Sequence, residues 1–221
     1  MKTGVHIVAD AADANCGAAS EGESRGKAMR EPALETLFQA LGQALRAASD
    51  PPDGARDAYE CVLQRLETPG EKASLAPRPQ TVVAEHLQPA LARARAVSAP
   101  LADALSSVAP HLAWAPKPGT EDVPGDFHRR HVNALIAGPE GLERREDVRV
   151  GISLLAPETR YPDHHHPPEE VYIALSEGDW RQNDGPWRRP GPGGLVYNPP
   201  DILHAMRSGA TPLFAVWLLP I

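Results

Sequence analysis

The sequence predicts a mainly β fold, in which a small barrel or sandwich fills the C-terminal half and an α-helical region precedes it. Three observations support this prediction. Apolar residues recur at helical spacing before about residue 115, and short segments with alternating apolar residues follow. Seven of the eleven aromatic residues lie within residues 161–221. The 24 prolines and 18 glycines favour many turns and argue against a helical bundle.

The predicted helices occupy the first half of the chain. In the first helix, apolar residues from Leu34 to Leu45 follow helical spacing, and Pro32 suits a first-turn position. The second helix repeats the pattern and ends before a Thr-Pro-Gly turn at residues 68–70. The third is rich in alanine and leucine, and Pro89 could break it. The four helices are predicted over Glu31–Ser49, Ala55–Leu66, Thr81–Val97 and Leu101–Val108.

Short strands separated by glycine and proline turns are predicted in the second half. Their close spacing, with aromatic residues inside them, is typical of a small sandwich or barrel. The predicted strands include Arg149–Leu154, Val171–Leu175, Gly194–Tyr197 and Leu213–Leu218. We therefore predict three parts: a small, polar and flexible segment over residues 1–30, a helical region over 31–115 and the β barrel over 116–221.

Composition and charge exclude several classes of protein. The net charge of -7 disfavours contact with phosphate backbones, so we expect no nucleic-acid partner. No segment approaches the ~20 consecutive apolar residues of a membrane helix, and the N-terminus lacks the apolar core of a signal peptide. Two cysteines, Cys16 and Cys61, do not make a disulfide framework. We expect a cytoplasmic protein with no membrane partner.

The most informative segment surrounds three adjacent histidines at residues 164–166. Alternate residues of a strand share one face, so residues of one parity would point the same way if the chain stays extended through the following Pro-Pro pair. These residues are His164, His166, Glu170 and Tyr172. Two imidazoles, a carboxylate and a phenol that converge form a site for a divalent metal. A distant histidine should complete the set.

His204 is the candidate for this distant ligand. It follows a predicted strand and a Pro-Pro turn, and it stands at the start of the next strand. The triple histidine alone could be a surface run, and His204 alone could be a buried core residue. Their combination with Glu170 at a fixed offset favours one metal site instead.

Two motifs around these residues resemble those of the cupin superfamily. The motifs are His164-x-His166-x3-Glu170 followed by Gly178, and Gly193-x5-Pro199-x-Asp201-x2-His204. The resemblance implies a double-stranded β-helix barrel with one metal inside. Three positions depart from the pattern, because Glu158 and Asp201 replace glycines and Ser208 replaces a final asparagine. These positions shape turns, whereas all four metal ligands are present.

A narrower resemblance is to the cupin-type dimethylsulfoniopropionate (DMSP) lyases. It rests on the segment from Tyr161 to Tyr172 and on the interval between His166 and His204, and it is specific over roughly residues 155–217. The helical half agrees only in general character. This family combines a helical N-terminal part with a C-terminal cupin, and it has tyrosines at the positions of Tyr161 and Tyr172.

The resemblance implies a β-elimination. A base removes the proton α to the carboxylate of DMSP, dimethyl sulfide leaves from the β carbon, and acrylate remains. One divalent transition metal (Zn, Fe, Mn or Ni) would act as a Lewis acid on the substrate carboxylate. Tyr172 is the expected general base, because a nearby dication favours its phenolate form. Tyr161 is the expected substrate orienter or alternative base.

The positive sulfonium of DMSP would favour aromatic faces in the binding pocket. The candidates are Trp217, Tyr197 and Trp180. Trp217 shares a strand face with Leu213 and Ala215, so it could point into the barrel.

Two alternative functions are open on the sequence alone. The same ligands serve other metal-dependent cupin enzymes, such as lyases, isomerases or dioxygenases that act on a different small carboxylate. The second alternative is a non-catalytic cupin that binds a metal or a ligand, in which Tyr172 would have no role. The resemblance also allows a homodimer, because cupins often pair through strand edges.

Overall fold

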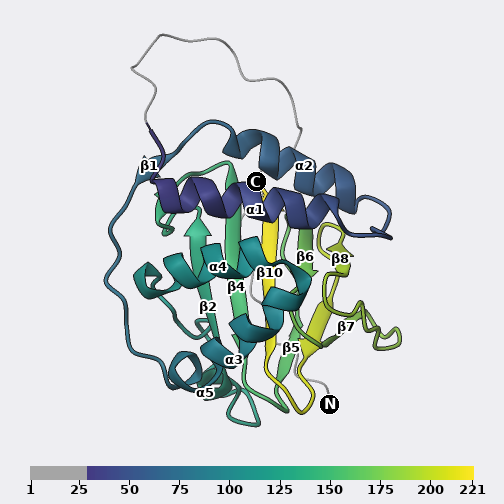
Figure 1. Cartoon of the computed structure of the whole chain (residues 1–221). Helices are drawn as coiled ribbons and strands as arrows, with labels where there is room; N and C mark the ends of the chain where they lie inside the picture. The colour runs from purple at the N-terminus through teal and green to yellow at the C-terminus, as the bar shows by residue number, and fades with distance from the viewer. Residues whose placement is uncertain (1–28) are drawn as a thin grey trace.

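The computed structural model of the chain describes residues 29–221 (Figure 1). The predicted flexible segment over residues 1–30 therefore lies outside the described residues, except for Met29 and Arg30. Helices come first along the chain and strands follow, as the sequence predicts. The boundary between a helical region and a barrel region near residue 115 stays a prediction.

Four main helices form the first part of the described chain. They are α1 (Pro32–Arg46), α2 (Ala55–Leu66), α3 (Thr81–Val97) and α4 (Ala99–Val108), followed by the 3-10 turn η1 (Ala109–His111) and the single turn α5 (Phe127–Arg130). The helix α3 continues through Pro89. This proline is exposed, so water can solvate the backbone carbonyl that it leaves unpaired. Within residues 29–221, no helix combines the length and apolar character needed to cross a membrane.

The strands form two sheets that face each other. The larger sheet has seven strands in the order β1-β3-β2-β4-β10-β6-β8, and the smaller has three in the order β5-β9-β7. The strands of the larger sheet are β1 (Glu71–Lys72), β2 (His131–Ala137), β3 (Glu143–Arg144), β4 (Val148–Leu155), β6 (Glu170–Ala174), β8 (Leu195–Asn198) and β10 (Leu213–Pro220). Those of the smaller sheet are β5 (Arg160–His164), β7 (Asp179–Gln182) and β9 (His204–Arg207).

The two faces of the larger sheet have different roles. Along β10, Phe214, Val216 and Leu218 pack into the core shared with the helices. The alternate residues Leu213 and Ala215 belong to a second core between the two sheets. Figure 1 shows α3 and α4 lying across one face of this sheet, with α1 and α2 near its upper end. The helices therefore cover one face, and the other face forms the barrel interior.

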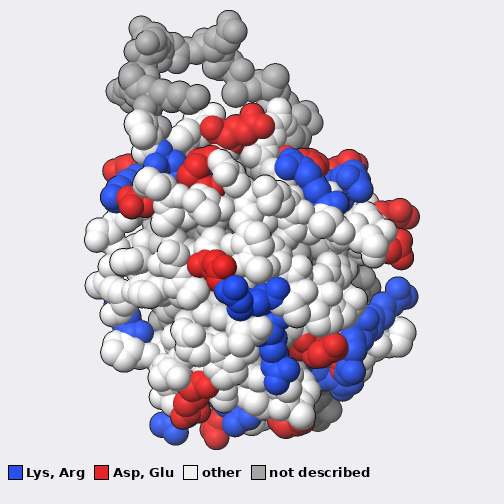
Figure 2. All heavy atoms as spheres, in the orientation of Figure 1, with Lys and Arg blue, Asp and Glu red and all other residues white. Residues whose placement is uncertain are grey.

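Charged side chains of both signs lie scattered over the helical face (Figure 2).

A buried ion-pair network connects the first described residues to the sheet. Glu143 of β3 is 2% exposed and accepts hydrogen bonds from Arg30 Nε at 2.6 Å, Arg145 Nη1 at 2.9 Å and the Gly70 backbone N at 2.9 Å. Burial alone would raise the pKa of Glu143, but these hydrogen bonds, led by that from Arg30, hold it below the ordinary 4.5.

A Glu143→Ala variant is expected to lose about 1–3 kcal/mol of unfolding free energy at neutral pH, because two buried guanidinium groups lose the buried carboxylate that they share and keep only the more exposed Glu35 and Asp147. The depressed pKa means that this stabilisation is present above about pH 4.5 and is lost as the pH falls further. Urea denaturation of wild type and variant at several pH values measures the difference. A variant as stable as wild type at neutral pH would contradict the role assigned to this network.

Candidate metal centre and active site

Three histidine side chains converge at one end of the barrel. His164 ends β5, His204 begins β9 opposite it in register, and His166 lies in the loop after β5. One ring nitrogen from each lies within 4.8 Å of the other two. The ring centroids of His164 and His204 are 4.2 Å apart. This spacing is suitable for a shared metal ion.

The local backbone fixes the orientation of all three rings. The Nδ1 atoms of His164, His166 and His204 lie 2.9, 2.8 and 2.9 Å from backbone carbonyl oxygens two residues away. Donation from Nδ1 selects the tautomer whose Nε2 lone pair is available to a metal. The buried Nε2 of His204 has no hydrogen-bond partner in the described chain. These donor atoms therefore fit a divalent transition metal.

Glu170 reaches the same point from the opposite sheet. Its Oε2 atom lies 3.4 Å from Nε2 of His166 and 3.3 Å from Nε2 of His204. The side chain is 5% exposed. Burial would raise the pKa of Glu170, but the contacts with His166 and His204 outweigh it and hold the pKa well below the usual range. The carboxylate is therefore ionised and available to a cation.

The chain does not remain extended between His164 and Glu170, and this corrects the argument from parity. Residues 165–169 form a loop that carries the chain from the smaller sheet to the larger one. His164 and Glu170 meet because β5 of the smaller sheet and β6 of the larger sheet face each other at this end of the barrel. The structure brings His164, His166, Glu170 and His204 together, but the extended chain that the alternation required is not present.

The three departures from the cupin pattern keep the local backbone geometry. Glu158 has φ of 52° and Asp201 has φ of 57°, so both adopt the left-handed conformation that glycine would take most easily. The Ser208 hydroxyl donates to the Ala156 carbonyl at 2.7 Å and accepts from the Thr159 backbone N at 2.8 Å. These contacts connect the end of β9 to the turn before β5.

Tyr172 brings a phenol to the carboxylate of the site. It stands on β6 two residues after Glu170, is 4% exposed and lies close enough to Glu170 to be affected by its charge. Burial, followed by the charge of Glu170, raises the pKa of Tyr172 well above its usual value. A divalent cation held by the adjacent histidines would act in the opposite direction and favour the phenolate.

Tyr161 lies on the other side of the histidines. Its ring centroid is 4.6 Å from that of His164 and 4.9 Å from those of Phe127 and His131. Burial raises the pKa of Tyr161 above its usual range, although a hydrogen bond with Asn133 opposes this effect. Tyr161 therefore forms part of an aromatic wall beside the histidines.

The three predicted substrate-contacting aromatics occupy different places. Trp217 and Trp180 belong to the core between the sheets, and the Trp180 ring centroid is 6.1 Å from that of Tyr172. The Trp217 ring lies so close to Gly151 that a Cβ there would be 2.2 Å from it. Tyr197 instead packs against the helix-facing core, and its hydroxyl donates to Glu169 at 2.7 Å. Only the two tryptophans lie inside the barrel.

Two polar residues near the cluster were not predicted from the sequence. Asn198 of β8 pairs with Glu170 of β6, and its Nδ2 donates to Glu170 Oε2 at 3.0 Å. Gln182 donates to Asn198 Oδ1 at 2.9 Å and so fixes the amide orientation. The second residue, Lys117, lies in the loop between η1 and α5 with its Nζ 5.2 Å from the centre of the Tyr161 ring. Neither stands at a specified position of the two motifs, and tertiary contacts bring both to the site.

An Asn198→Ala variant is expected to bind the metal about 10–100-fold more weakly, because the hydrogen bond that orients Glu170 is lost. Competition with a chelator measures the affinity for Zn²⁺. Asn183→Gly is the matched control, since Asn183 is exposed and has a φ of 49° that glycine accepts. An unchanged affinity in Asn198→Ala would contradict the orienting role.

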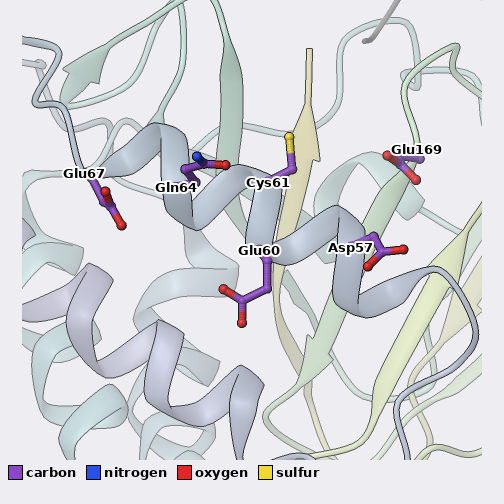
Figure 3. Close-up of a pocket in the computed structure, with 6 residues that line it drawn as sticks. All are labelled: Asp57, Glu60, Cys61, Gln64, Glu67 and Glu169. Carbon is purple, nitrogen blue, oxygen red and sulfur yellow. The ribbon is translucent and has the colours of Figure 1, made fainter. Parts of the chain in front are cut away.

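A separate surface hollow lies along α2. Figure 3 shows its lining residues, which are Asp57, Glu60, Cys61, Gln64, Glu67 and Glu169. None of these is a histidine. Glu169 and Glu170 are neighbours in sequence, but Glu169 points to this hollow whereas Glu170 points to the histidine cluster. The hollow is therefore distinct from the candidate site.

The two-sheet barrel, with three imidazoles and a carboxylate gathered at one end, defines a cupin with a candidate metal centre. The comparison with known families is consistent with this architecture. The sequence profile of the dimethylsulfoniopropionate lyases matches residues 55–215. The chain belongs to this family.

Individual relatives agree with the family assignment. DddL of Cereibacter sphaeroides, provisionally named a DMSP lyase, is 37% identical over 107 residues, which are 48% of this chain and 44% of that protein. The DMSP lyase DddQ of Ruegeria pomeroyi is 31% identical over 94 residues, 42% of this chain and 47% of that protein. The matches thus span just under half the length of these curated relatives. The crystal structure of DddQ from Ruegeria pomeroyi DSS-3 gives a TM-score of 0.57 at 25% identity, covering 87% of this chain and 93% of that chain.

Proposed function

We propose that this protein cleaves DMSP to dimethyl sulfide and acrylate, using one divalent transition metal (Zn, Fe, Mn or Ni). The observation that carries the proposal is the position of a buried phenol, Tyr172, on the same strand as Glu170 and beside three convergent imidazoles. A phenol in this position suits removal of a carbon-bound proton. The family assignment supports DMSP as the substrate.

His164, His166, Glu170 and His204 would hold the metal, because their donor atoms face one another and their orientations are fixed by hydrogen bonds. When bound, the ion would supply Lewis-acid stabilisation of the negative charge that develops on the substrate carboxylate. Asn198 holds the Glu170 carboxylate in its orientation. Glu170 and His204 are buried, whereas His164 and His166 are partly exposed, so solvent reaches the site from one side.

Tyr172 acts as the general base in this proposal. Its phenolate oxygen takes the proton from the α carbon, and the electron pair of that C–H bond forms the new double bond to the β carbon. The β carbon–sulfur bond breaks, and its electron pair leaves with dimethyl sulfide. The proton remains on Tyr172 until it returns to solvent. Tyr161 orients the substrate from the opposite side of His164.

The sulfonium end of the substrate would contact the aromatic part of the barrel interior. Trp180 and Trp217 lie there with Tyr172, and aromatic faces attract a cation by about 0.5–2 kcal/mol. Tyr197 lies on the helix-facing side of the sheet, so we do not include it in this subsite. A homodimer and a cytoplasmic location stay predictions from the sequence.

The test of this proposal uses the full chain loaded with metal and incubated with DMSP. Gas chromatography of the headspace measures dimethyl sulfide, and chromatography of the solution measures acrylate. We expect equal amounts of the two products, none after chelation and recovery when metal is restored. A metal-loaded protein that releases neither product would refute the DMSP assignment, and other small carboxylates would then be assayed.

A further inference from the structure

Lys117 is held in a fixed loop beside the histidine cluster. Ala115, two residues earlier, exchanges two backbone hydrogen bonds with Asn133 of β2, at 2.9 and 2.8 Å. On the other side, the Thr120 hydroxyl donates to the Lys117 carbonyl at 2.5 Å. The loop is therefore attached to β2 before the lysine and closed by a turn after it. This arrangement positions the side chain.

The ammonium group of Lys117 lies over the aromatic wall next to the candidate metal ligands. Its Nζ atom is 5.2 Å from the centre of the Tyr161 ring, and that ring is 4.6 Å from the His164 ring. His164 and His166 are partly exposed, whereas His204 is buried, so solvent reaches the cluster from the side of the first two. Lys117 is likewise partly exposed.

No anion of the described chain pairs directly with Lys117. Within residues 29–221, no carboxylate oxygen lies within 4 Å of its Nζ atom and no side chain accepts a hydrogen bond from it. Burial lowers the pKa of Lys117 to about 8, and the charge of Glu170 only partly offsets this effect. A partly buried cation without a paired anion is unfavourable, so the position favours an anionic ligand.

We propose that Lys117 binds the carboxylate of the substrate and makes the site selective for small monocarboxylates. The inference rests on the proposed function for the identity of that substrate. A carboxylate beside Lys117 would also lie next to the histidine cluster, with the rest of the molecule directed towards Tyr172 and the tryptophans of the barrel interior. Neutral analogues of the same shape would lack this contact.

The electrostatics of the site support an anion at this position. Glu170 contributes one negative charge, whereas a divalent ion and Lys117 together would contribute three positive charges. The site would therefore carry a net positive charge before substrate binds, and a carboxylate reduces it. His131 lies in the same wall, fully buried, and its pKa is lowered to about 3 by burial and then by Lys117. It therefore adds no charge at neutral pH.

The experiment measures binding of propionate and of the neutral propionamide to the metal-loaded full chain by calorimetry. Lys117→Met removes the charge while it keeps the length of the side chain, and Lys117→Arg retains the charge. Lys72→Met is the matched control, because Lys72 is exposed on β1 and its substitution changes the net charge by the same amount as Lys117→Met. Metal content and thermal unfolding are measured for every variant, and the KM for DMSP is measured in parallel.

We expect Lys117→Met to weaken propionate binding about 10–100-fold, equivalent to about 1.4–2.7 kcal/mol, with the metal content unchanged. The KM for DMSP should rise by a similar factor, whereas propionamide binding and the Lys72→Met variant should show little change. Lys117→Arg keeps the charge and should bind propionate more tightly than Lys117→Met. Propionate binding equal to wild type in Lys117→Met would overturn the inference and leave the proposed lyase function intact. Lys117-dependent propionate binding by a wild-type protein that does not cleave DMSP would support the subsite and refute the lyase proposal.

Discussion

A Tyr172→Phe variant is expected to lose DMSP cleavage by a factor of about 10²–10⁴, the usual contribution of a positioned general base. The substitution removes only the hydroxyl, which is affected by the charge of Glu170, and Glu170 in turn contacts two of the histidines. The ring keeps its place in the core between the sheets. We therefore expect normal metal content and folding with little dimethyl sulfide. Headspace chromatography and elemental analysis of the same sample measure both properties.

Tyr59→Phe is the control for this substitution. Tyr59 is buried in α2, and its hydroxyl has no hydrogen-bond partner in the described part of the chain. Removing it deletes the same atom far from the histidine cluster, and activity should stay at the wild-type level. If Tyr172→Phe released dimethyl sulfide at the wild-type rate, Tyr172 would not be the base.

The second large effect is expected from removal of a metal ligand. Loss of a hydrogen bond that orients a metal ligand weakens metal binding about 10–100-fold. His204→Ala removes a ligand itself, so it should weaken metal binding by more than this. Cleavage of DMSP should fall to background, because the buried His204 supplies one of the three convergent imidazole nitrogens and contacts Glu170. Elemental analysis after dialysis gives the metal content, and the headspace assay gives the activity.

His165→Ala serves as the matched control for the ligand variant. His165 stands between two proposed ligands in sequence, but its side chain is 38% exposed and its Nδ1 atom lies 3.7 Å from Asp201. We expect this variant to retain metal and activity. The opposite pattern, with metal lost from His165→Ala and kept in His204→Ala, would show that the ligands have been assigned wrongly.

Much of the fold could be predicted because local sequence signals are strong. The apolar spacing of α2 predicted its bounds, Ala55–Leu66, and the alternation along β10 predicted that Trp217 shares a face with Leu213 and Ala215. The prediction that Trp217 faces the barrel follows from the same alternation. These features depend on residues that are close together in the chain, so they can be predicted without knowledge of the tertiary contacts.

The parts that could not be predicted depend on contacts between distant segments. The orienting role of Asn198 requires the pairing of β8 with β6, and Lys117 reaches the site only because its loop pairs with β2. The extended chain assumed between His164 and Glu170 failed for a similar reason, since it ignored the passage from one sheet to the other. Tyr197 is different: it neighbours the inward-facing Asn198, so strand alternation could have placed it on the helix-facing side.

The central claim is that the α proton of DMSP is removed in the step that releases dimethyl sulfide. Single-turnover measurements with metal-loaded enzyme in excess test it, comparing ordinary DMSP with DMSP deuterated at the α carbon. The account predicts slower release from the deuterated substrate by wild type. Equal rates from both substrates, together with no uptake of solvent deuterium into recovered DMSP, would contradict proton removal at this carbon and the role of Tyr172.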